Sequence, residues 1–148
     1  MRDACKHTHL SIASGICEDG RIIYQVRQNS FNGPAMVLFL EEIRKKIKEK
    51  VLIIWDGARI HSCNAVKNYL FKQKLENIWL VKTPAYSPEL NADELVWNYI
   101  KNVELKYVCC KGINELRAKT IIAMESLKEK KEIIQSFFRH HSVGFINN

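Results

Sequence analysis

Two acidic residues stand where a carboxylate could hold a divalent metal ion. Asp56 directly follows the apolar run Val51–Trp55, and Glu94 comes early in a later segment with a helical pattern. Metal-dependent phosphoryl-transfer sites are commonly built from a carboxylate at the end of a buried strand and another carboxylate on a helix. The two residues therefore suggest metal-dependent phosphoryl transfer.

Both acids also have simpler structural explanations. Asp56 and Gly57 form a common turn pair, in which an acid caps the turn or the next helix. Asn91 precedes Glu94 by three residues, which is close to the capping-box pattern. Asp93 competes with Glu94, because successive helical residues point about 100° apart and one rigid geometry does not suit both as ligands. Local sequence alone leaves these alternatives open.

The elements around Asp56 should place it at an edge where ligands bind. The unbroken apolar run Val51–Trp55 predicts a strand buried on both faces in a sheet covered by helices. Ligands of open α/β sheets bind at the carboxyl ends of the strands, which is the position of Asp56. A helix should begin at Ser62 or Cys63, and residues 77–81 should form another short buried strand.

Further elements are predicted on either side of this region. Two β-favouring runs, 8–17 and 21–27, flank an Asp-Gly pair that is typical of an antiparallel hairpin. A helix should have Pro34 in its first turn and end near 48–50. A last helical region, at about 113–139, should pack over the sheet.

The helix that carries Glu94 should point this residue away from the core. Asn91 is a suitable N-cap, and the apolar stripe that follows predicts a helix to about Tyr107. The stripe consists of Ala92, Leu95, Val96, Tyr99, Ile100 and Val103. Glu94 lies opposite the stripe, on the same side as Trp97 and Lys101, so we expect it to face solvent or a crevice.

Composition limits the class of protein. At 148 residues with 47% apolar content, the chain is expected to form a single domain over 1–148. No apolar stretch approaches the roughly 20 residues of a membrane span, and the first residues have no signal-peptide core, so we expect a cytoplasmic, DNA-associated protein without a membrane partner. The net charge of +7 suits a polyanionic partner, although many lysines alternate with acids as on a solvated helix face.

The five cysteines suggest neither a disulfide framework nor a zinc site. Their number is odd, their spacing is irregular and no C-x-x-C pair occurs. The alternating segment Cys5–His9 has no second half-site at zinc-finger spacing. We expect the cysteines to be reduced thiols.

The stretch from Val51 to Lys101 resembles the catalytic half of transposases in the mariner superfamily, the DDE group of bacterial insertion-sequence enzymes. The resemblance rests on Trp55-Asp56-Gly57-Ala58-Arg59-Ile60-His61-Ser62, on Thr83-Pro84-Ala85-Tyr86-Ser87-Pro88-Glu89-Leu90-Asn91, and on Glu94-Leu95-Val96-Trp97 with Lys101. It continues more weakly through the hairpin and through residues 29–32 and 136–139. The resemblance implies an RNase H-like (retroviral-integrase-like) mixed sheet flanked by helices, in which three carboxylates hold two Mg²⁺ or Mn²⁺ ions.

The resemblance also implies roles for individual residues. Asp56 matches the second acid of the family and Glu94 the third, which favours Glu94 over Asp93. The residues expected to support the carboxylates or to contact DNA are Arg59, His61, Trp97 and Lys101; a structural role for His61 is an equal alternative. The implied partner is DNA, both transposon ends and target. Two departures are tolerable: Gly57 stands where the family more often has Asn, and Ala92 where it has Pro.

The first acid of the family precedes the hairpin, and here only residues 1–7 do. Asp3 is the one upstream candidate, and no apolar run before it forms a strand. We therefore expect a carboxyl-terminal catalytic fragment without the first central strand or the amino-terminal helix-turn-helix. We expect this fragment to be inactive alone. It is either a decayed or truncated element or the second half of an enzyme whose first half is supplied in trans, and an open sheet edge would favour a homodimer or aggregation. The rival reading is a non-catalytic DNA-binding or partner-binding remnant, and a weaker one is another kind of RNase H-like nuclease.

Overall fold

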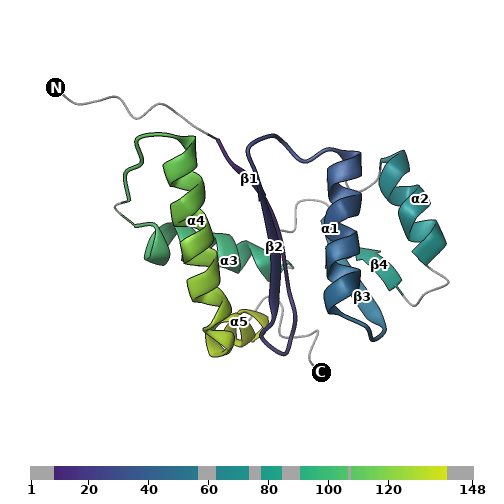
Figure 1. The fold of residues 1–148 in the computed structure, drawn as a ribbon. Helices are drawn as coiled ribbons and strands as arrows, with labels where there is room; N and C mark the ends of the chain where they lie inside the picture. Colours follow the sequence, from purple (N-terminus) through teal and green to yellow (C-terminus); the bar gives the residue numbers. More distant parts are fainter. Residues whose placement is uncertain (1–8, 57–62, 74–77, 85–90, 107, 140–148) are drawn as a thin grey trace. The chain divides into compact units, whose positions relative to one another are not determined.

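The computed structural model describes residues 9–56, 63–73, 78–84, 91–106 and 108–139 (Figure 1). Its elements follow the predicted β-β-α-β-α-β order and continue with helices. They are β1 (Ser11–Ile16), β2 (Ile22–Arg27), α1 (Gly33–Lys46), β3 (Val51–Trp55), α2 (Asn64–Gln73), β4 (Ile78–Lys82), α3 (Asp93–Tyr99), η4 (Ile100–Glu104), α4 (Ile113–Lys128) and α5 (Lys131–Phe138). The chain divides into two compact units: residues 1–30 with 92–148, here the hairpin unit, and residues 31–91, the parallel unit.

The predicted hairpin opens the hairpin unit. Strands β1 and β2 pair antiparallel, with Ser14 opposite Tyr24. The connecting turn is closed by a hydrogen bond from the Cys17 N–H to the Arg21 carbonyl oxygen at 2.8 Å. Gly20 has a φ of 93°, which a side chain would disfavour. A Cβ at this position would also lie 2.9 Å from Lys131, so the turn sits tightly against the start of α5.

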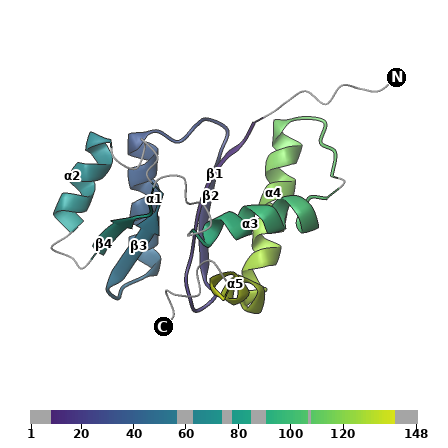
Figure 2. The ribbon, with the colours of Figure 1, turned by 180° about the vertical axis from the view of Figure 1, so that it is seen from behind.

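Helices α3, α4 and α5 cover one face of the hairpin (Figures 1 and 2). The core of the unit forms where these helices meet the strands, and its buried members are Ile22, Val96, Ile100, Ala123, Met124, Leu127 and Ile134. The region predicted as helical over 113–139 is confirmed but interrupted between α4 and α5. Both helices reach the same core, since Met124 and Leu127 of α4 and Ile134 of α5 are buried members of it.

The helix that carries Glu94 differs from its prediction at both ends. Ala92, not Asn91, is the N-cap residue of α3, and no side chain caps it. Regular α-helix ends at Tyr99, and η4 continues as a π-helical turn with a hydrogen bond from the Leu105 N–H to the Ile100 carbonyl oxygen. The wider turn shifts the helical phase. Leu105 therefore packs on the core, whereas Val103, predicted in the apolar stripe, is 57% exposed.

The parallel unit contains α1, β3, α2 and β4. Asn32 caps α1, since its side chain accepts a hydrogen bond from the Ala35 N–H at 2.9 Å, and the helix ends at Lys46, slightly earlier than predicted. Strand β3 has the predicted bounds and pairs parallel with β4. The predicted start of α2 falls partly outside the described residues, and the helix begins at Asn64.

One expectation about β3 is wrong, because the strand is not buried on both faces. Leu52 is 59% exposed, and on β4 Trp79 and Val81 are 42% and 47% exposed. Leu52 is paired with Trp79, and Ile54 with Val81, so these side chains share one face of the two-stranded sheet. Helix α1 lies behind the sheet in Figure 2, on the opposite face. Among the described elements of this unit, none covers the Leu52 face.

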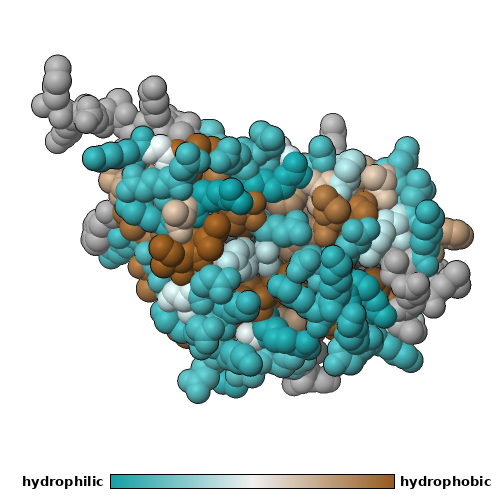
Figure 3. Space-filling model, viewed as in Figure 1, coloured by the Kyte–Doolittle hydropathy of each residue, from teal (hydrophilic) through white to brown (hydrophobic). Residues whose placement is uncertain are grey.

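The described surface is largely hydrophilic on the side drawn in Figure 3, with hydrophobic residues showing over α1 and α4. These helices carry Leu38 and Ile122, which are 58% and 68% exposed. None of the helices in the described residues has the length and apolar content to cross a membrane. The four described cysteines are thiols, as predicted.

Candidate functional site

Asp56 lies at the carboxyl end of β3, where the parallel strands of its unit terminate together. Its side chain is exposed. Lys82 ends β4 opposite Trp55 and is also exposed. The Thr83 N–H donates to the Trp55 carbonyl oxygen at 2.8 Å, so the ladder extends to the residue before Asp56. This edge therefore presents a carboxylate and an ammonium group on a backbone fixed by β-pairing.

Glu94 lies in the first turn of α3, in the hairpin unit, and its side chain is exposed as predicted. The capping-box alternative does not hold, because the N-cap residue is Ala92 and makes no side-chain hydrogen bond. The first turn contains two acids, Asp93 and Glu94, and no base. An acid in this position is favoured by the helix dipole.

Asp93 is half-buried and hydrogen-bonded within the hairpin unit, whereas its neighbour Glu94 is exposed. The Ser14 hydroxyl lies 2.8 Å from each of its two carboxylate oxygens. A further side-chain hydrogen bond joins Asp93 to Trp97, whose indole N–H is a donor. Burial raises the pKa of the Asp93 carboxyl to about 7, the charge of Glu94 adds to this, and the hydrogen bonds with Ser14 and Trp97 act in the opposite direction.

The remaining residues predicted from sequence divide into two groups. Arg59 and His61 lie outside the described residues, as does the upstream candidate Asp3. Trp97 is half-buried beside Asp93, whereas Lys101 in η4 is exposed. The structure therefore brings Trp97 together with Asp93 and leaves Lys101 accessible.

Sequence reasoning did not identify Ser14. The signal available was the alternation of β1, in which Ser14 interrupts the apolar face formed by Ile12 and Ile16. A small polar residue on a core-facing strand position usually has a buried partner, because an unpaired hydroxyl there is unfavourable. The identity of the partner could not be read from the sequence, since Asp93 is 79 positions away.

The donor set suits a hard divalent cation. Asp56 and Glu94 offer exposed carboxylate oxygens, the ligands preferred by Mg²⁺ and Mn²⁺. Asp56 belongs to the parallel unit and Glu94 to the hairpin unit. Within the described part of the chain, no three acidic, histidine or cysteine side chains are grouped so that they could hold a metal ion. The exposed carboxylate of each residue has the chemistry that such an ion prefers.

The fold is similar to that in "Mos1 transposase paired-end complex with left transposon end", with a TM-score of 0.58 and 14% sequence identity. The similarity covers 84% of this chain and 42% of that chain, so the present sequence spans less than half of the Mos1 chain. It confirms the predicted α/β, RNase H-like fold class. No curated protein sequence matches the chain.

The family model described as DDE superfamily endonuclease matches residues 2–116, which is well over half of the chain. The matched span contains β3 with Asp56 after it, the residues between β4 and α3, and α3 with Glu94. The chain belongs to the DDE superfamily of endonucleases.

Proposed function

We propose that the chain is the catalytic part of a transposase that cuts and joins DNA by metal-dependent phosphoryl transfer. The observation that carries the proposal is the contrast in the first turn of α3. Asp93 is bound by Ser14, and Glu94 is exposed and available as a ligand. Membership of an endonuclease family, with a match that spans Asp56 and Glu94, supports the same reading.

In this proposal Asp56 and Glu94 are the protein ligands of a pair of Mg²⁺ or Mn²⁺ ions. When bound, such ions prepare a water or a DNA 3′-hydroxyl for attack and stabilise the leaving oxygen. The strand end and the helix start hold the carboxylates, and the exposed ammonium groups of Lys82 and Lys101 provide charge for DNA phosphates. Arg59 and His61 are proposed to support the carboxylates or to contact DNA. The proposed partners are transposon ends and target DNA.

We propose further that the third carboxylate comes from another polypeptide, on a strand that pairs with β3. Support comes from the sheet order of the parallel unit, in which β3 has only β4 as a neighbour among the described strands. An added strand would satisfy the backbone groups on the other edge. A second copy of the chain could occupy the same edge, which would give a homodimer.

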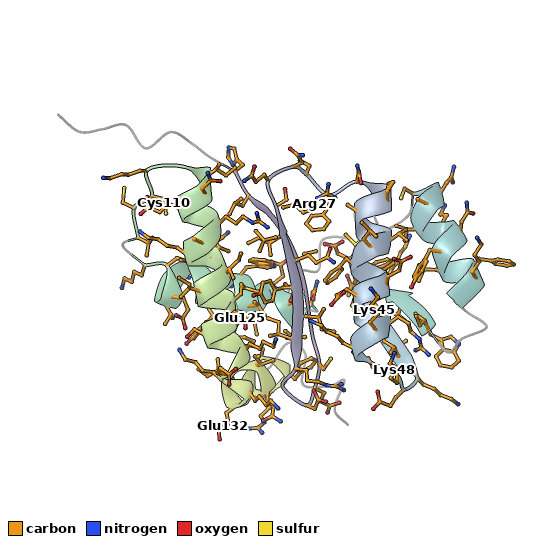
Figure 4. The ribbon with its side chains drawn as sticks, viewed as in Figure 1. Arg27, Lys45, Lys48, Cys110, Glu125 and Glu132 are labelled. Atoms are coloured by element: carbon orange, nitrogen blue, oxygen red, sulfur yellow. The ribbon has the colours of Figure 1, made fainter. Side chains whose placement is uncertain are left out.

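Titration of the chain with Mn²⁺, followed by isothermal calorimetry, tests the metal site. We expect Asp56→Ala and Glu94→Ala each to lower the affinity at least about tenfold, because each removes a ligand. Glu132→Ala is the matched control, since Glu132 is an exposed acid in the first turn of α5 (Figure 4) and should leave the affinity unchanged.

Two results would contradict the proposal for this chain. One is the absence of Mn²⁺ binding to the unaltered protein. The other is binding that Asp56→Ala and Glu94→Ala weaken no more than Glu132→Ala does. Either result would favour a domain that binds DNA or a partner without performing chemistry.

A further inference from the structure

The face of the hairpin that meets the helices contains one polar rung. Ser14 on β1 and Tyr24 on β2 are direct register partners, and their neighbours on this face are aliphatic. Each polar side chain reaches a different helix: Ser14 bonds to Asp93 of α3, and the Tyr24 hydroxyl donates to a Glu125 oxygen of α4 at 2.5 Å. Glu125 lies on the α4 ribbon beside the hairpin in Figure 4. The rung therefore ties the hairpin to two helices independently.

The Ser14 end of the rung fixes the start of α3 more completely than packing alone. Asp93 is held from the strand by Ser14 and from its own helix by Trp97, one turn later. The helix has only seven residues and no side-chain cap. The hydrogen bonds of Asp93 therefore add to the packing of Val96 in holding its first turn. A fixed Asp93 backbone fixes the next residue, whose side chain points about 100° away around the helix.

We propose that Ser14 and Trp97 are positioning residues that act through Asp93 to hold Glu94 in the orientation needed for metal ligation. The inference rests on the proposed metal-dependent function and adds residues that do not themselves touch the metal. Residues that orient a metal ligand typically change metal affinity by about 10-fold to 100-fold when they are removed. The expected loss of affinity comes from a change in the orientation of Glu94, because the variants keep the Glu94 side chain.

A carboxylate at this position is not explained by stability alone. Burial disfavours its charged form, and apolar residues of similar size often stabilise a core interface at least as well as a buried polar pair does. The hydrogen bonds between Ser14 and Asp93 fix the orientation of both side chains and of the first turn of α3. This distinguishes a positioning role from ordinary packing.

The test compares Ser14→Ala with Tyr24→Phe in the full chain. Both variants remove one hydroxyl from the same rung, but only Ser14→Ala frees the start of α3. Mn²⁺ affinity is measured by calorimetry, and hydrogen exchange of the α3 amides from Leu95 to Tyr99 is measured without metal. We expect Ser14→Ala to weaken Mn²⁺ binding about tenfold or more and to accelerate α3 exchange. Tyr24→Phe should leave Mn²⁺ affinity unchanged and should accelerate α3 exchange no more than exchange elsewhere in the hairpin unit. Ser14→Thr, which keeps the hydroxyl, should restore both quantities.

The inference is overturned if Ser14→Ala leaves α3 exchange unchanged, or if Tyr24→Phe alters exchange and affinity to the same extent. Failure of the proposed function looks different: Glu94→Ala then has no effect on Mn²⁺ binding, or the unaltered chain does not bind Mn²⁺. In that case exchange alone decides the role of Ser14. Faster α3 exchange in Ser14→Ala, restored by Ser14→Thr, supports the positioning contact, and equal exchange removes it.

Discussion

The two units support their acidic residues in different ways. In the hairpin unit, α3 rests on a closed core in which Val96, Met124, Leu127 and Ile134 are all 0% exposed. In the parallel unit, β3 leads to Asp56 but exposes Leu52 on one face, and Trp79 and Val81 on β4 are exposed beside it. The helix that carries Glu94 therefore packs on a buried core, whereas the sheet before Asp56 has exposed apolar side chains that another element could cover.

This difference bears on the proposed metal site, because a side chain is held only as firmly as the residues packed beneath it. A parallel sheet is normally buried on both faces, so a bare apolar face is unusual in a finished structure. In the hairpin unit, the face of the strands that meets the helices is covered, because three helices pack there. We expect metal ligation by Asp56 to depend more strongly on added partners than ligation by Glu94.

The largest expected effect comes from truncating equivalent side chains in the two units. Leu127→Ala should lower the free energy of unfolding by about 2–5 kcal/mol, because it leaves a cavity in a closed core. Leu52→Ala should cost less than about 1 kcal/mol, since that side chain is already mostly in water. Urea denaturation followed by circular dichroism measures both. Equal losses would show that the Leu52 face is covered in solution, and the contrast between the units would disappear.

A smaller effect tests how tightly the hairpin unit is closed. Gly20→Ala should cost about 1–3 kcal/mol, because the positive φ disfavours a side chain and the new Cβ would press on Lys131. Gly15→Ala is the control, as a Cβ there meets nothing within 4 Å. The Tm of Gly20→Ala should be clearly lower than the Tm of Gly15→Ala. A Gly20→Ala variant as stable as Gly15→Ala would mean that the turn is not seated on α5.

The smallest effect concerns the Tyr24 end of the polar rung. Tyr24→Phe should cost about 1 kcal/mol at neutral pH through loss of the bond to Glu125. Burial, and then the hydrogen bond and charge of Glu125, raise the pKa of the Tyr24 hydroxyl above its usual value. The unfolded chain therefore ionises first, so the stabilisation is complete below about pH 10 and declines as pH rises further. Urea denaturation from pH 7 to 11 measures the free energy of unfolding of both proteins. Above about pH 10 it should fall more steeply in the unaltered protein than in Tyr24→Phe.

Sequence predicted those features that depend on neighbouring residues. The Asp-Gly turn identified the hairpin, and the unbroken apolar run gave β3 its bounds and placed Asp56 just beyond it. The exposure of Glu94 followed from helical spacing. The failures have non-local causes. Asn91 does not cap α3, the helical phase changes at η4 so that Leu105 reaches the core, and the partner of Asp93 is a distant serine.

The hairpin unit is discontinuous in sequence, and this has a consequence for its synthesis. Its strands are made first, the whole parallel unit follows, and the helices that cover the strands are made last. Residues 31–91 form one continuous segment, so all of its elements have been synthesised before α3 is made. The hairpin must wait, with the apolar side chains of one face unprotected, until α4 and α5 have been translated. A nascent chain stalled before α4 should therefore be the form most dependent on chaperones.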